Sequence, residues 1–145
     1  MSVSMVVRFL LLLTFSPFHD FFFRIEGSSS SSQEAMSIEK VQSKAHFRTQ
    51  VSQPNLTVVM FTAMWCQPCK KILPEVERLS YRYPKVTFIK CDIDDHAEIA
   101  ERCFIKALPT FMFCRSGDQL GYTVGADMRD VRAQVMRFVT PEEKG

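Results

Sequence analysis

Two cysteines, Cys66 and Cys69, stand two residues apart in the stretch FTAMWCQPCKK, which spans residues 61–71. A Cys-x-x-Cys pair can be a redox dithiol, half of a metal site, or chemically inert. A tetrahedral metal site needs two more ligands. The chain has no second Cys-x-x-Cys, and from residue 36 onward its only histidines are His46 and His96. The pattern therefore favours a redox dithiol, and it predicts neither a metal site nor a cofactor.

The segments on either side of the pair predict where it lies. Residues 56–62 form a β-branched apolar run of strand length, and residues 66–83 carry apolar residues at helical spacing. Cys66 is thus expected at the N-terminus of a helix, where unpaired N–H groups and the macrodipole favour an anion. We expect Cys66 to have a lowered pKa and to be the nucleophile. Cys69, one turn further on and more enclosed, is placed to attack a mixed disulfide at Cys66.

The rest of the chain from residue 36 alternates between strand and helix patterns. The expected elements are a short strand running into a helix at 37–51, strands at 56–62, 86–91, 110–114 and 119–124, helices at 66–83 and 96–103, and a last helix capped by Asp127. Ser116-Gly117-Asp118 is typical of a hairpin turn. The order βαβαβαββα predicts an α/β fold in which helices flank both faces of a mixed central sheet.

Two helices carry more specific expectations. Pro74 lies inside the helix at 66–83 and predicts a kink there, because proline removes a backbone donor and clashes with the preceding turn. The last helix is predicted to be amphipathic and carries four apolar residues. They are Val131, Val135, Met136 and Val139.

Composition restricts the class of protein. A chain of 145 residues with 46% hydrophobic residues allows one domain with a real core. The net charge is only +2, and scattered basic residues give no nucleic-acid-binding stripe, so we expect no nucleic-acid partner. We also expect a monomer. Five cysteines cannot all pair within the chain, which favours a mostly reduced environment. Cys91, Cys103 and Cys114 are interpreted as small hydrophobic residues, with Cys103 a candidate for regulatory oxidation.

Residues 1–35 are treated as separate from the domain at 36–145. Residues 1–24 are apolar but interrupted, too broken for a membrane span of about 20 residues, and a Ser-rich polar linker follows. Three interpretations stay open: a signal peptide, an organelle transit peptide, or upstream sequence before a true start at Met36. The first two predict the secretory pathway or an organelle, and the third predicts the cytoplasm. Membrane attachment requires residues 1–24 to be retained as an anchor.

From about Ile38 to Phe138 the chain resembles the thioredoxin family, in particular its small eukaryotic cytosolic members. The stretches that resemble the family's active-site strand and helix, third strand, cis-proline segment and final hairpin are VVMFTAMWCQPCKKILPEVERLS, FIKCDID, IKALPTFMF and SGDQLGYTVGAD. The resemblance implies the thioredoxin fold and a dithiol–disulfide exchange cycle on protein substrates. Cys66 attacks a substrate disulfide, Cys69 resolves the intermediate, and a thioredoxin reductase returns the electrons.

The resemblance also implies a substrate-binding surface beside Cys66. Pro109 by itself is expected to be trans, since only about one X–Pro bond in twenty is cis. The resemblance makes it cis, with Leu108 offering backbone pairing to an extended peptide. The other expected members of this surface are Trp65, Gln67, Pro68, Ala107 and Gly125.

Two positions depart from the family's pattern. Gln67 replaces the usual glycine and gives the exposed tip a longer polar side chain. Met60 replaces a buried aspartate that accepts the proton of the resolving cysteine, and Lys90, otherwise read as a solvated strand residue, loses its acidic partner. Since methionine cannot accept a proton, we expect slower resolution by Cys69 and longer-lived mixed disulfides.

Two functions of different class follow. The intact Cys66/Cys69 pair favours a thioredoxin-like protein-disulfide reductase, which is the leading hypothesis. Met60 and Gln67 favour the alternative, a thioredoxin-fold binding or adaptor module with weak turnover.

Overall fold

The structure is a computed structural model that describes residues 38–145. The expectations for residues 1–35, a targeting or anchor segment followed by a linker, lie outside the described residues. Within residues 38–145, no helix is both long and apolar enough to cross a membrane.

The described elements follow the predicted order. They are β1 (Glu39–Lys40), α3 (Lys44–Val51), β2 (Thr57–Thr62), α4 (Gln67–Arg82), β3 (Thr87–Asp92), α5 (Ala97–Arg102), β4 (Thr110–Arg115), β5 (Asp118–Val124), α6 (Met128–Phe138) and the 3₁₀ helix η2 (Pro141–Lys144). The strands lie in the order β1-β3-β2-β4-β5. β3 runs parallel to β1 and β2, whereas β4 runs antiparallel to β2 and β5. The α/β class and the mixed sheet are confirmed.

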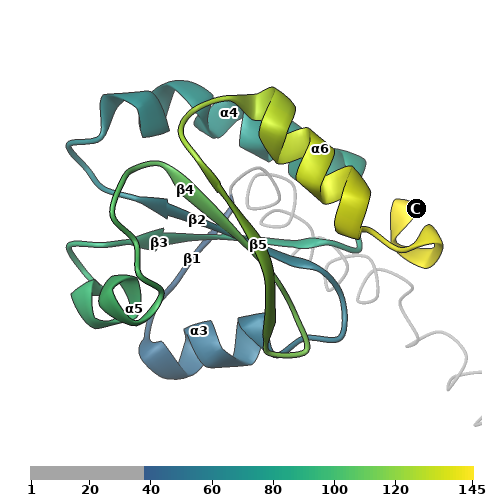
Figure 1. Cartoon of the computed structure of the whole chain (residues 1–145), viewed down its shortest axis with the longest axis horizontal. Coiled ribbons are helices and arrows are strands. Elements are labelled where there is room, and N and C mark those ends of the chain that lie inside the picture. The colour runs from purple at the N-terminus through teal and green to yellow at the C-terminus, as the bar shows by residue number, and fades with distance from the viewer. Residues whose placement is uncertain (1–37) are drawn as a thin grey trace, which may run out of the picture. The chain divides into compact units, whose positions relative to one another are not determined.

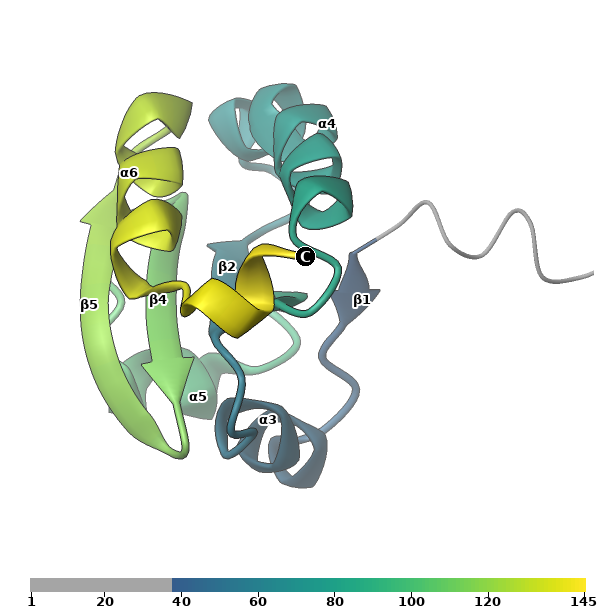
Figure 2. The same ribbon diagram turned by 90° about the vertical axis from the view of Figure 1, so that its right-hand side faces the viewer.

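Helices cover both faces of the sheet, as predicted. Figures 1 and 2 show α4 and α6 on one face and α3 and α5 on the other. β2 lies between β3 and β4, and its side chains alternate between two hydrophobic clusters. Val58 and Met60 belong to the cluster under α4 and α6, and Val59 and Phe61 belong to the one under α3 and α5. Burial on both faces explains the continuous apolar run of this strand.

The helices confirm most of the expected packing. α4 buries Cys69, Ile72, Val76 and Leu79, whose spacing places them on one face, and it contains Pro74. In α6, Asp127 is the N-cap and accepts a hydrogen bond from the Arg129 N–H at 2.9 Å. Of the four apolar residues named for this helix, Val131, Val135 and Val139 are buried. Met136 is 64% exposed, because one residue beyond the buried Val135 the helix has turned by about 100°.

The predicted hairpin joins β4 to β5 through Ser116 and Gly117. Their φ angles are 53° and 87°, the left-handed conformation that two-residue hairpin loops require. The turn is also tied to the end of α3, since the Ser116 N–H donates to the Gln53 carbonyl at 2.8 Å and the Gly117 N–H donates to the Val51 carbonyl at 2.9 Å.

The 3₁₀ helix near the C-terminus was not predicted. Its Glu143 is only 4% exposed, and its carboxylate accepts hydrogen bonds from the Leu56 N–H at 2.6 Å and from Arg115 at 2.7 Å. Burial alone would raise the pKa of Glu143, but the N–H groups of Thr140 and Leu56 and the charge of Arg115 outweigh it and lower that pKa. This carboxylate fixes the chain at the entrance to β2, the strand that leads to the cysteine pair.

Candidate active site

Cys66 and Cys69 are joined by a disulfide, with their Cα atoms 5.3 Å apart. Cys66 is the N-cap of α4, and its Sγ accepts a hydrogen bond from the Cys69 N–H at 3.4 Å. The pair thus lies at the N-terminal end of a helix, where free N–H groups and the macrodipole favour a thiolate once the bond is reduced. Both residues are enclosed in this oxidised form, with 4% of Cys66 and 1% of Cys69 exposed.

The turn between β2 and α4 sets the position of Cys66. The strand ends at Thr62, and the Cys66 N–H donates to the Ala63 carbonyl at 3.0 Å, which closes the turn. Pro68 follows in the first turn of α4. Proline is tolerated there because the first N–H groups of a helix have no partner within it.

An open pocket of about 520 Å³ lies beside Cys66. Five of the residues expected at the substrate surface line this pocket with Cys66. They are Trp65, Gln67, Pro68, Ala107 and Leu108. Trp65 is 63% exposed, yet its Nε1–H donates to Asp94 Oδ2 at 3.0 Å, which holds the ring edge in place. A large aromatic side chain is therefore held at the surface next to the disulfide.

The other two expected surface residues, Pro109 and Gly125, do not line this pocket. The Leu108–Pro109 peptide bond is cis, as the resemblance implied, and Pro109 is buried. The Pro109 carbonyl accepts a hydrogen bond from the Gly125 N–H at 2.8 Å. Gly125 has a φ of 101°, a conformation that favours glycine. This hydrogen bond joins the end of β5 to the residue that follows Ala107 and Leu108 of the pocket.

Sequence reasoning missed several residues of this surface. Ile93, Ile105 and Lys106 complete the pocket, and Asp94 holds Trp65. The acidic turn after β3 was visible in the sequence, but nothing local shows that one of its carboxylates meets a side chain 29 residues earlier. Among residues 38–145, no group of three or more His, Cys, Asp or Glu side chains is placed to hold a metal ion.

Known proteins match the chain over most of this domain. The family model for thioredoxin matches residues 38–137. The chain belongs to the thioredoxin family. Human thioredoxin is 35% identical over 104 residues, which cover 70% of this chain and 99% of that protein. Mitochondrial thioredoxin-3 of Saccharomyces cerevisiae is 38% identical over 91 residues, which cover 63% of this chain and 72% of that protein.

Solved thioredoxin structures also match the fold of this chain. The crystal structure of thioredoxin from Trypanosoma brucei brucei has a TM-score of 0.68 and 38% identity, and the match covers 74% of this chain and 96% of that one. The oxidised mitochondrial thioredoxin 3 of Saccharomyces cerevisiae has a TM-score of 0.67 and 34% identity, over 71% of this chain and 97% of that one. Fold and family are therefore both established.

Membership of the thioredoxin family decides between the two functions considered. The chain is a dithiol–disulfide oxidoreductase, a protein-disulfide reductase whose redox-active pair is Cys66 and Cys69. The alternative of a binding module with weak turnover is not favoured by these relatives.

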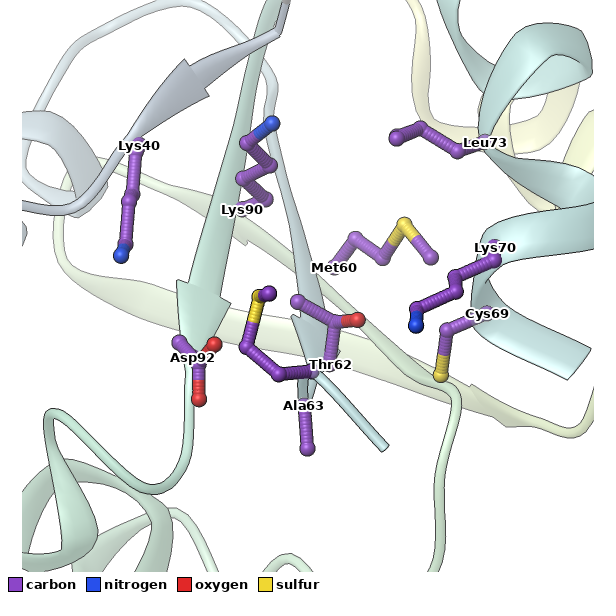
Figure 3. Close-up of a pocket in the computed structure, with 10 residues that line it drawn as sticks. Lys40, Met60, Thr62, Ala63, Cys69, Lys70, Leu73, Lys90 and Asp92 are labelled. Carbon is purple, nitrogen blue, oxygen red and sulfur yellow. The ribbon is translucent and has the colours of Figure 1, made fainter. Parts of the chain in front are cut away.

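The departure at Met60 lies directly behind this pair. Met60 is 2% exposed and is the cross-strand neighbour of Lys90. Both residues line a separate pocket together with Cys69, and Figure 3 shows Met60 extending towards Leu73 and Cys69 of α4. The interpretation of Lys90 as a solvated strand residue was incomplete, because its side chain is half-buried at this pocket.

The three remaining cysteines are free thiols on the other face of the sheet. Cys91 is 0% and Cys114 is 3% exposed, and Cys103 is half-buried. Burial, assisted by the nearby Cys103, raises the pKa of Cys91 and of Cys114 to about 12. Burial also raises the pKa of Cys103. These thiols stay protonated at neutral pH, which agrees with their interpretation as small hydrophobic residues.

Proposed function

We propose that Cys66 is the nucleophile and Cys69 the resolving cysteine of protein-disulfide exchange. The Cys66 thiolate attacks one sulfur of a substrate disulfide, forming a mixed disulfide and releasing one substrate thiolate. The Cys69 thiolate then attacks Cys66 Sγ, which releases the second substrate thiolate and closes the Cys66–Cys69 bond. One observation carries this assignment: Cys66 lines the open pocket beside Trp65, whereas Cys69 lines the other pocket.

The substrates proposed are proteins with an extended segment around a disulfide. Trp65, Ala107 and Leu108 offer apolar contact at the pocket, and the Leu108 backbone is the proposed pairing site for the peptide. One matched structure, with 34% identity and a TM-score of 0.66, concerns the thiol resolving mechanism of a yeast mitochondrial 1-Cys peroxiredoxin via glutathione/thioredoxin systems. Oxidised thiol proteins of this kind are therefore included among the proposed substrates.

The proposal extends to the electron donor and the compartment. A thioredoxin reductase is the proposed donor, and the domain at 36–145 acts as a monomer. Translation from Met36 gives a cytoplasmic protein, whereas a targeting segment within residues 1–24 delivers it to the secretory pathway or an organelle. The matched relatives include mitochondrial thioredoxins, which supports the organelle alternative alongside the cytoplasmic one. Mass spectrometry of the mature N-terminus distinguishes these cases.

Insulin-disulfide turnover by the full chain with a thioredoxin reductase tests the function. We expect multiple turnovers by the natural chain and none by Cys66→Ser. Cys69→Ser should accumulate a mixed disulfide that peptide mapping places at Cys66. A mixed disulfide at Cys69 in the Cys66→Ser variant, with turnover retained, would contradict the assigned roles.

A further inference from the structure

A second pocket, of about 290 Å³, lies behind the disulfide. It shares no lining residue with the pocket beside Cys66. Its wall includes Cys69 and the apolar side chains of Met60, Ala63 and Leu73. Lys40, Lys70, Lys90 and Asp92 supply the charged part of the lining, and Figure 3 shows the side chains from β1, β2, β3 and α4 around this space.

The lysines of this pocket are not all neutralised. Lys40 pairs with Asp95 at 2.6 Å. Within residues 38–145, neither Lys70 nor Lys90 has a hydrogen bond or an ion pair through its ammonium group. Asp92 is the pocket's single carboxylate, and its Oδ1 already accepts a hydrogen bond from the Asp94 N–H at 3.0 Å. The lining therefore has one more positive than negative charge after the Lys40–Asp95 pair is set aside.

Strand register explains why Lys90 lacks a partner. Lys40 on β1, Lys90 on β3 and Met60 on β2 are successive cross-strand neighbours. Like charges placed opposite each other destabilise a sheet, and Lys90 has an ammonium on one side and an apolar side chain on the other. An aspartate at position 60, as in the family's pattern, would balance this charge. Met60 instead places an apolar wall beside the half-buried side chain of Lys90.

We propose that this pocket binds a small organic monoanion with an apolar body, an aryl carboxylate by chemical class. The apolar body packs against Met60 and Leu73, the carboxylate pairs with Lys90, and Lys70 adds a positive charge on the Cys69 side of the pocket. A space of 290 Å³ suits a ligand of about a dozen non-hydrogen atoms. Because Cys69 is part of the wall, the ligand lies in contact with the redox pair.

The test is a titration of the oxidised full chain with 2-naphthoate, followed by ¹H–¹⁵N NMR. We expect saturable shifts at Cys69, Lys70 and Lys90, and binding of the neutral analogue 2-naphthylmethanol at least fivefold weaker. Lys90→Met keeps the apolar stem and removes the charge, so it should weaken 2-naphthoate binding about tenfold. Lys106→Met, in the pocket beside Cys66, is the matched control and should change binding less than twofold.

A second variant guards against misfolding of the first. Lys70 is exposed, so Lys70→Met leaves the core intact and should weaken binding about threefold. Equal affinity for the acid and the alcohol, or unchanged binding in both lysine variants, would overturn the proposal. Shifts confined to Trp65 and Ala107 would overturn it too, because they would place the anion in the substrate pocket. The titration involves no turnover, so its outcome is independent of the function proposed above.

Discussion

The two faces of the central sheet both contain cysteines, and burial does not tell them apart. Cys66 lies under α4 and α6 and is 4% exposed, whereas Cys114 lies under α3 and α5 and is 3% exposed. The difference is in the local backbone. Cys66 caps a helix N-terminus beside an open pocket, and Cys114 lies within a strand surrounded by apolar side chains. We therefore expect the reactivity of these cysteines to follow from free N–H groups and access rather than from total exposure.

Cys69 and Cys91, the next cysteine on each face, differ in the same way. Cys69 donates its N–H to Cys66 Sγ and lines a pocket that also contains lysines. Cys91 lies within β3, where burial raises the pKa of its thiol to about 12. The redox pair thus lies at a helix N-terminus on one face of the sheet, whereas burial keeps the thiols on the other face neutral.

The largest expected effect comes from removing one cysteine from each face. Cys66→Ser should lower insulin-disulfide turnover at least a thousandfold, because serine forms no mixed disulfide. Cys114→Ala removes a sulfur of equal burial and should change turnover less than twofold. Steady-state assays of the two variants beside the natural chain test this, and a comparable loss in Cys114→Ala would break the contrast.

The alkylation rate of Cys66 should exceed those of Cys91 and Cys114 by almost as large a factor. In the reduced, folded chain at pH 8, a thiol with a pKa of about 12 is a thiolate about one part in ten thousand of the time. We expect iodoacetamide to modify Cys66 at least several hundred times faster than Cys91 or Cys114, as measured by time-resolved peptide mapping. In urea the rates should converge. Rapid modification of Cys91 in the folded chain would show that its burial does not protect it.

The buried thiols of Cys91 and Cys114 should also make the stability of the fold depend on pH. The pKa values of Cys91 and Cys114 are raised from 9.0 to about 12, so the folded chain holds these protons more tightly than the unfolded chain does. The contribution is therefore complete below pH 9 and is lost as the pH rises from 9 towards 12. Between pH 8 and pH 10 we expect the free energy of unfolding to fall by about 2–3 kcal/mol more than in a Cys91→Ala/Cys114→Ala variant. Urea unfolding curves at the two pH values measure this, and equal pH dependence of both chains would contradict it.

The smallest expected effect concerns the pocket behind Cys69. Met60→Asp supplies a proton acceptor, so the mixed disulfide at Cys66 should be resolved about tenfold faster. Rapid-quench measurement of mixed-disulfide decay tests this. Met136→Asp makes the same change at an exposed position of α6 and serves as the control. Equal decay rates for the natural chain and Met60→Asp would mean that Cys69 needs no acceptor at this position.

Much of this fold and site could be predicted from the sequence, because the signals are local. The apolar run of β2, the helical spacing of α4 and the Cys66/Cys69 pair lie within one continuous stretch. The residues 116–118 likewise place the hairpin turn. Pro109 is different, because its own sequence favours trans and only the resemblance to a family predicted the cis bond.

What the sequence could not provide depends on contacts between distant residues. Glu143 meets the Leu56 N–H across 87 residues, and Trp65 meets Asp94 across 29. Periodicity could not separate Val135 from Met136, because adjacent residues lie about 100° apart and the apolar stripe of a helix is about as wide, so both fit it. The charge of the pocket behind Cys69 depends on strand register, which brings Lys40 and Lys90 together from positions 50 residues apart in numbering.

A redox titration resolved by residue tests the contrast between the two faces most directly. The full chain is equilibrated with glutathione buffers of graded potential, its thiols are alkylated, and each cysteine is mapped by mass spectrometry. We predict that Cys66 and Cys69 oxidise together as a two-electron couple, while Cys91 and Cys114 remain thiols at every potential. Oxidation of Cys91 or Cys114 in the same range, or of Cys66 without Cys69, would contradict this account.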